Sequence, residues 1–80
     1  MRPVAKNVLA ASVELSPRQE EVIALMADGL TDREIAQELC ISPRTVRMHS
    51  EVLRRKLGVT KRRHIIPMYF DLVVRETFPP

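Results

Sequence analysis

Helix-start signals follow one another closely in this chain, and they restrict it to short helices joined by tight turns. Ser16 precedes Pro17 and stands three residues before Gln19, which is the pattern of a capping box with proline at the first helical position. Ser42 followed by Pro43 repeats the cap and the proline. Each signal opens a new helix, so no long helix is expected across this region.

A stop signal and a further start signal complete the outline of the first two helices. Gly29 ends the first helix, with Leu25 and Leu30 placed to close its C-terminal turn. Thr31 and Glu34 form a second capping box, which opens a short helix of roughly two turns. The apolar residues expected to be buried at helical spacing are Leu15, Val22, Ile23 and Met26 in the first helix and Ile35, Ala36 and Leu39 in the second.

A third helix is predicted from Pro43 to Leu57, where Gly58 ends it, and its length is about 22 Å. Ile41 precedes the cap and is placed to pack on Val46, a contact that fixes the angle at which the chain joins the helix. The expected inner face comprises Val46, Ser50, Leu53 and Leu57. The expected outer face comprises Arg44, Arg47, Met48, Glu51 and Arg55.

The last helix is expected to begin near Thr60 or Lys61 and to end near Thr77. Pro67 predicts a kink or a restart within it, because proline removes a hydrogen bond and costs ~3 kcal/mol inside a helix. A helix that begins at Pro67 is the alternative. The sequence thus predicts an all-α domain over residues 14–77, with a flexible tail or linker stub at 1–13 and a short C-terminal tail at 78–80.

Charge is distributed unevenly along the chain, although the net charge is only +3. From Glu14 to Glu38, seven acids stand against two arginines, which gives −5. From Ser42 to Arg63, eight basic residues stand against Glu51, which gives +7. A basic helix face is often merely solvated, but an excess of this size indicates a surface that binds a polyanion.

Other function classes find little support in the residues. Cys40 is the only cysteine, and neither His49 nor His64 stands at a zinc-ligand spacing from it, so no metal or cofactor is expected. We expect Cys40 to be a small buried residue, with a redox-sensing thiol as the alternative. No membrane span, signal peptide or catalytic constellation is recognisable, which indicates a cytoplasmic protein that is not an enzyme.

Three consecutive runs of residues carry a resemblance to a known family. They read LSPRQEEVIALMADGL, then TDREIAQEL, then ISPRTVRMHSEVLRRKLGV, and they extend from Leu15 to Val59. In this order they resemble the LuxR-type (GerE-like) DNA-binding domain. The resemblance implies a four-helix helix-turn-helix bundle of a bacterial transcription regulator, which lays its third helix in the major groove of double-stranded DNA.

The resemblance also implies roles for individual residues. Arg47 and Met48 match positions that touch base edges, and Arg44 and Glu51 share their groove-facing side. Phosphate contacts are expected of Thr31, Arg33, Thr45, His49, Arg55, Lys56 and Arg62. Three residues depart from the family pattern: Glu51 is acidic where a polar or basic residue is usual, Ser50 replaces an aliphatic residue, and Lys61 replaces a small polar one.

The fourth helix is more apolar than one edge of a small core requires, so part of it is expected to meet a second copy of the chain. The residues predicted for a homodimer interface are Ile66, Tyr69, Phe70 and Val73. The alternative is that they complete the core of a monomer. Two alternative functions share the fold: a module like region 4 of sigma factors, which acts with RNA polymerase, and a protein-interaction domain that does not bind DNA.

Overall fold

The computed structural model describes residues 13–78, which form four α-helices and one 3₁₀ turn. In chain order these are α2 (Pro17–Ala27), α3 (Asp32–Leu39), α4 (Pro43–Leu57), the 3₁₀ turn η1 (Arg62–His64) and α5 (Ile65–Thr77). No strand occurs between residues 13 and 78, and the predicted all-α fold is confirmed. The tail predicted at residues 1–13 lies outside the described residues except for Val13, and so do residues 79–80.

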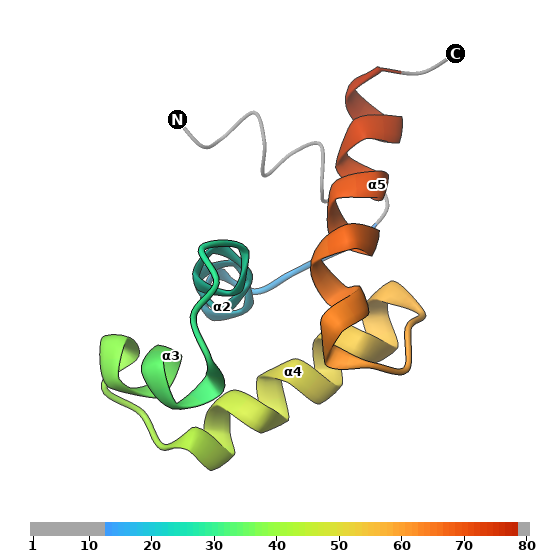
Figure 1. The fold of residues 1–80 in the computed structure, drawn as a ribbon. Helices are drawn as coiled ribbons and strands as arrows, with labels where there is room; N and C mark the ends of the chain where they lie inside the picture. Colours follow the sequence, from blue (N-terminus) through green and yellow to red (C-terminus); the bar gives the residue numbers. More distant parts are fainter. Residues whose placement is uncertain (1–12, 79–80) are drawn as a thin grey trace.

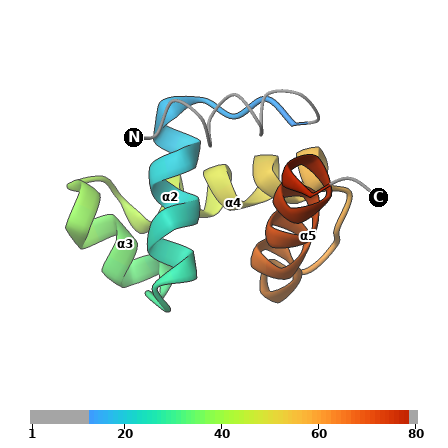
Figure 2. The same cartoon turned by 90° about the horizontal axis from the view of Figure 1, so that it is seen from above.

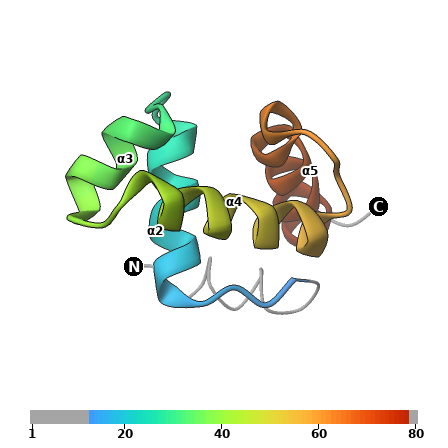
Figure 3. The same cartoon turned by 90° about the horizontal axis from the view of Figure 1, so that it is seen from below.

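Helix α4 organises the fold, because it contacts every other helix. In Figure 1 it runs along the bottom of the molecule, with α3 beside its first turns and α5 rising near its other end. Seen from above in Figure 2, α2 crosses over α4 on the same side as α5. Figure 3, seen from below, shows α4 nearest to the viewer with no other helix across it. One side of α4 therefore faces the core and the opposite side faces outward.

The helix ends are fixed by the local signals that the sequence contains. Both capping boxes are formed: Ser16 with Gln19, and Thr31 with Glu34. Gly29 adopts φ 89°, and its N–H donates to the carbonyl of Met26 while the N–H of Leu30 donates to that of Leu25. This pair of bonds satisfies carbonyls at the end of α2. Gly58 ends α4 in the same left-handed region, with φ 73°.

One apolar core holds the helices together. Its buried side chains come from all four helices: Val22, Ile23 and Met26 in α2, Ile35 and Ala36 in α3, Val46, Leu53 and Leu57 in α4, and Ile65 in α5. Each large aliphatic side chain buried in this way contributes ~1.5–3 kcal/mol relative to leaving it in water. Leu15, Leu39 and Ile41 are half-buried and pack against this core. Leu15 and Leu39 are thus less buried than predicted.

Cys40 is exposed, so the prediction that it is a small buried residue is wrong. It ends α3 in the left-handed conformation, with φ 57° and ψ 44°, and it is the only non-glycine residue with positive φ between residues 13 and 78. The N–H of the following Ile41 donates to the carbonyl of Ala36. The chain reverses direction at Cys40, so its side chain lies at the surface while Ile41 returns to the core.

The start of the last helix also differs from the prediction. Residues 62–64 form the 3₁₀ turn η1, and α5 begins at Ile65 rather than at Thr60 or Lys61. Pro67 is the third residue of α5, where a backbone N–H has no partner within the helix. The proline therefore removes no hydrogen bond, and the predicted restart within the helix is wrong. The predicted end at Thr77 is confirmed.

Candidate nucleic-acid interface

The two faces of α4 are separated as the sequence predicts. Val46, Ser50, Leu53 and Leu57 are buried. Arg44, Arg47, Met48, Glu51 and Arg55, which share the opposite side of the helix by their spacing, are exposed. Met48 is 56% exposed, so this face carries one accessible apolar side chain. The outward face is therefore polar and mostly basic, with one apolar and one acidic residue in its middle.

The charged groups of this face make no ion pairs within residues 13–78. The three ion pairs of this region join Arg18 to Glu21, Arg62 to Asp32, and Arg75 to Asp71. The guanidinium groups of Arg44, Arg47 and Arg55 consequently have no acidic partner at 4 Å or less. Their positive charge remains available to an external anion.

The start of α4 combines its cap with two half-buried polar residues. Ser42 Oγ accepts a hydrogen bond from the N–H of Thr45 at 3.1 Å, and the two hydroxyl oxygens are 3.0 Å apart. Thr45 and His49 are both half-buried along one edge of the helix. The free N–H groups of the first turn add partial positive charge at this end, which favours an anion such as phosphate.

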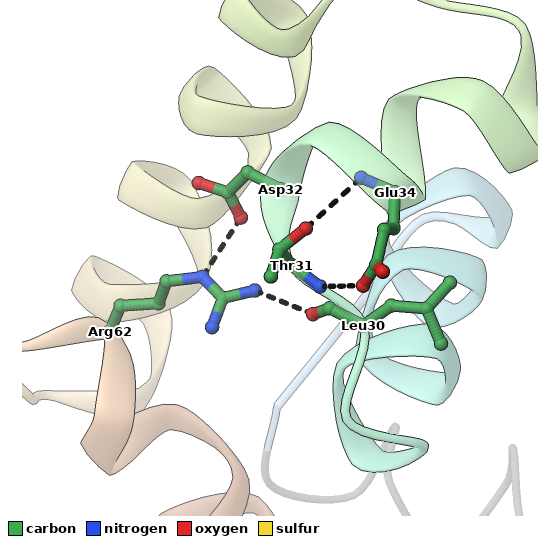
Figure 4. A network of polar contacts seen from close by, with 5 residues as sticks. All are labelled: Leu30, Thr31, Asp32, Glu34 and Arg62. Atoms are coloured by element: carbon green, nitrogen blue, oxygen red, sulfur yellow. Dashed lines mark hydrogen bonds and ion pairs between the residues drawn. The ribbon is translucent and has the colours of Figure 1, made fainter.

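The start of α3 is fixed by a network of polar contacts, drawn in Figure 4. Thr31 Oγ1 accepts from the N–H of Glu34 at 3.2 Å, and Glu34 Oε1 accepts from the N–H of Thr31 at 2.9 Å. Arg62 reaches this point from η1: its Nε donates to Asp32 Oδ1 at 2.8 Å and its Nη2 to the carbonyl of Leu30 at 3.2 Å. The network joins the connection before α5 to the first turn of α3.

Lys56 makes a second long-range connection. Its Nζ donates to the carbonyl of Glu14 at 2.6 Å and to Gln19 Oε1 at 3.0 Å. The same Gln19 oxygen accepts from the N–H of Ser16 at 3.0 Å, within the capping box of α2. Lys56 thus attaches the last turn of α4 to the segment through which the chain enters the domain.

The structure therefore divides the predicted phosphate contacts into three groups. Thr31, Arg33 and Arg55 are exposed, whereas Thr45 and His49 are half-buried. The donors of Lys56 and Arg62 are engaged inside the domain by residues 30 to 42 positions away in the chain. Sequence reasoning missed these two internal roles, because no local pattern pairs residues so far apart. All seven phosphate contacts stay predictions.

The exposed face of α5 is apolar. Among the residues predicted for a dimer interface, Phe70 is 52% exposed, while Ile66, Tyr69 and Val73 are half-buried. Ile66 and Tyr69 pack against the core. Val74 and Phe78, at 52% and 72% exposure, extend the surface of Phe70 at spacings of four residues. Val74 and Phe78 were not among the residues predicted for the interface, although they follow Phe70 at the spacing of one helical face.

Among residues 13–78, no three or more His, Cys, Asp or Glu side chains lie together as a metal site would require. No helix in this part of the chain has the length and apolarity needed to cross a membrane.

Comparison with known proteins gives a family match over most of the chain. The family described as "Bacterial regulatory proteins, luxR family" matches residues 13–69. Similar curated proteins include the transcriptional regulatory protein UhpA of Escherichia coli K12, 39% identical over 57 residues, which are 71% of this chain and 29% of UhpA. The transcriptional regulatory protein DesR of Bacillus subtilis is 46% identical over 48 residues, 60% of this chain and 24% of DesR.

A third relative is the transcriptional regulatory protein MctR of Rhizobium johnstonii, 31% identical over 68 residues, which are 85% of this chain and 32% of MctR. The chain thus spans a third or less of the length of these relatives, and 6% of a longer regulator from Mycobacterium bovis. The matches confirm the predicted class, a helix-turn-helix domain of a bacterial transcription regulator and not an enzyme.

Proposed function

The chain belongs to the LuxR family of bacterial regulatory proteins, and we propose that it reads a specific double-stranded DNA site with α4 in the major groove. The observation that carries this proposal is the outward face of α4, where Arg44, Arg47 and Arg55 are exposed and free of ion pairs within residues 13–78. Helix α4 is about 22 Å long, and it packs one face on the core while the opposite face is exposed. These are the properties of a helix that lies in the major groove.

Base contacts are assigned to the first half of α4. Arg47 presents two parallel donors that match guanine O6 and N7, a pairing that discriminates by ~1–3 kcal/mol against another base. Met48 offers an apolar surface for a thymine methyl group, and Arg44 lies one turn closer to the start of the helix. Glu51 completes this set of four residues on the groove side.

Phosphate contacts position the domain on the duplex and carry no sequence information themselves. Exposed Arg33 on α3 and exposed Arg55 on α4 supply charge, and Thr31, Thr45 and His49 add hydrogen-bonding groups on the same two helices or at the start of α3. Lys56 and Arg62 each retain donors beyond the internal bonds described above. They contribute to phosphate binding while also holding the parts of the domain that carry the other contacts.

The regulator is proposed to act as a homodimer in the bacterial cytoplasm, with contacts to RNA polymerase at the promoter. The apolar surface of Phe70, Val73 and Val74 on α5 supports pairing with a second copy. Ile66 and Tyr69 border this surface. A two-fold dimer would present two copies of α4 to half-sites about one helical turn, ~10 base pairs, apart.

The experiment that tests the proposal is DNA binding by the chain to a randomised duplex pool, followed by a salt series on the selected sequence. We expect a selected motif and a steep loss of affinity with salt, because each neutralised phosphate releases counterions. Arg47→Ala should weaken binding to the motif about tenfold or more and relax the preference at one base pair. Arg18→Ala, which removes the same charge from α2, is the matched control.

The alternatives give different outcomes in the same experiment. A flat salt response and no selected motif would contradict DNA binding and favour a protein-interaction domain. Selection that occurs only when RNA polymerase is present would favour a module that works within the polymerase, like region 4 of sigma factors.

A further inference from the structure

Glu51 lies at the centre of the proposed DNA-reading face. It is exposed, and it stands four residues after Arg47 and four before Arg55 in α4. Residues four apart lie above one another on a helix surface, so the three side chains form one stripe. Glu51 lies one turn from Arg47 on the same side of the helix, so it also faces the floor of the groove when Arg47 reads a base edge. Glu51 is therefore placed toward base edges rather than toward either sugar–phosphate strand.

The carboxylate of Glu51 is not neutralised by its neighbours. Arg47, Arg54 and Arg55 all stand three or four residues away, yet none lies within ion-pair distance of Glu51. The side chain also makes no hydrogen bond that would give it a structural role among residues 13–78. An unpaired acid on a face that meets a polyanion weakens binding to every sequence unless a base supplies a donor.

Only one base offers a donor to a carboxylate in the major groove without an adjacent acceptor. Cytosine presents its N4 amino group, whereas guanine presents two acceptors and thymine presents O4. Adenine presents a donor at N6 next to an acceptor at N7. A carboxylate, which only accepts, is therefore matched by cytosine and repelled by guanine and thymine.

The spacing between Glu51 and Arg47 sets the distance between the bases they read. Four residues advance the helix by about 6 Å, and successive base pairs are separated by about 3.4 Å. A helix in the major groove lies oblique to the duplex axis, so this rise brings the two side chains to base pairs one or two steps apart.

We infer that Glu51 is a specificity-determining residue that selects a cytosine one or two base pairs from the guanine read by Arg47. The inference rests on the proposed function and refines it. The recognised half-site then contains a guanine and a cytosine at a fixed spacing, each read by one charged side chain. Glu51 lowers non-specific affinity for DNA and so widens the gap between this site and all others.

The test compares the pools of duplexes selected by the wild-type chain and by Glu51→Gln. Glutamine keeps the shape of the side chain, removes the charge and pairs with adenine N6 and N7. We expect the cytosine position to change to adenine while the rest of the motif is retained. On single duplexes, Glu51→Gln should lose about tenfold in affinity for the cytosine site and should bind other sequences more tightly than the wild type.

Glu38→Gln is the matched control, because Glu38 is an exposed acid on α3 with no ion pair within residues 13–78. It should leave the motif unchanged. The same motif for wild type and Glu51→Gln, with affinity raised equally for all sequences, would overturn the inference while leaving the proposed function intact. Absence of any selected motif with the wild type would overturn both.

Discussion

Ser50 places a hydroxyl group inside the apolar core, on the inner face of α4. It is 3% exposed, and its Oγ is the only buried side-chain polar atom between residues 13 and 78 without a hydrogen-bond partner. A buried hydroxyl that has lost its water costs about 1–3 kcal/mol. We expect Ser50→Ala to raise the free energy of unfolding by about 1 kcal/mol, because alanine removes this group and favours a helix more than serine does.

Thermal unfolding should be measured for Ser50→Ala and, as its matched control, for Ser42→Ala. Ser42 also contributes a hydroxyl to α4, but its Oγ accepts from the N–H of Thr45 and caps the helix. Its loss should lower stability by about 1 kcal/mol. For a domain of this size, each change corresponds to a shift of about 4–8 °C in Tm, in opposite directions. Equal losses in the two variants would show that Ser50 Oγ is bonded.

Tyr69 is the residue whose ionisation reports on the packing of α5 against α2. Burial, and to a lesser degree the negative charge of Glu20, raise the pKa of Tyr69 above its ordinary value of 10.0. A raised pKa in the folded state gives a stabilising contribution that is fully present below the unfolded pKa and is lost as the pH rises through the folded pKa. The domain should therefore lose stability from this source only in strongly alkaline solution.

Titration of phenolate absorbance tests this assignment directly, because the chain contains one tyrosine and no tryptophan. The midpoint for the folded chain should lie at higher pH than the midpoint in urea. Glu20→Gln should move the folded midpoint part of the way back, since burial is the larger cause. Coincident midpoints for the folded and unfolded chains would mean that Tyr69 is solvated.

At the scale of helices, the sequence was sufficient wherever a boundary depends on neighbours in the chain. Capping boxes and left-handed glycines act within about four residues, so the ends of α2 and the whole extent of α4 were predicted correctly. The left-handed conformation and exposure of Cys40 were not predicted, because cysteine, unlike glycine, gives no sequence signal for positive φ. The start of α5 was predicted too early, because residues 60–64 contain no capping hydrogen bond or glycine that would mark where the helix begins.

Contacts between helices could not be read from the sequence in the same way. The bonds of Lys56 to Glu14 and Gln19 join residues 42 and 37 positions apart, and Arg62 reaches Asp32 over 30 positions. Such contacts depend on how the core places whole helices. The sequence predicted a positive charge at both positions, but the internal partners appear only when the fold is assembled.

Lys56→Met and Arg55→Met each remove one positive charge, but only Lys56→Met also removes hydrogen bonds within the domain. Comparing the two variants therefore separates the structural role of Lys56 from its charge. Methionine keeps an apolar stem of similar length but loses the donors to Glu14 and Gln19. We expect a loss of up to about 1 kcal/mol in the free energy of unfolding, a modest value because water competes for an exposed ammonium group. Arg55→Met removes a neighbouring exposed charge that has no ion pair within residues 13–78, so its stability should be unchanged.

Urea unfolding measures both variants, and the slope of DNA affinity with salt measures the loss of phosphate contacts. Arg55→Met should reduce that slope by about one contact. Equal stability of the two variants would show that the hydrogen bonds of Lys56 contribute nothing to the fold.

Considered as a whole, the molecule keeps its two candidate interaction surfaces on different helices. The basic face belongs to α4 and points downward in Figure 1, whereas the exposed apolar side chains belong to α5, which rises away from it. A second copy bound at α5 would therefore leave both α4 faces open. This arrangement allows one dimer to read two half-sites, which a shared surface would prevent.

Phe70→Glu should abolish dimerisation without unfolding the domain, because Phe70 is 52% exposed and is not part of the buried core. Sedimentation equilibrium should give a mass that rises with concentration for the wild type and a constant monomer mass for the variant. Affinity for a duplex with two half-sites should fall, while affinity for a single half-site should not change. Met48→Gln, which alters an exposed apolar residue on α4, should dimerise normally. A wild-type chain that remains monomeric at every concentration would instead assign the apolar face of α5 to another partner.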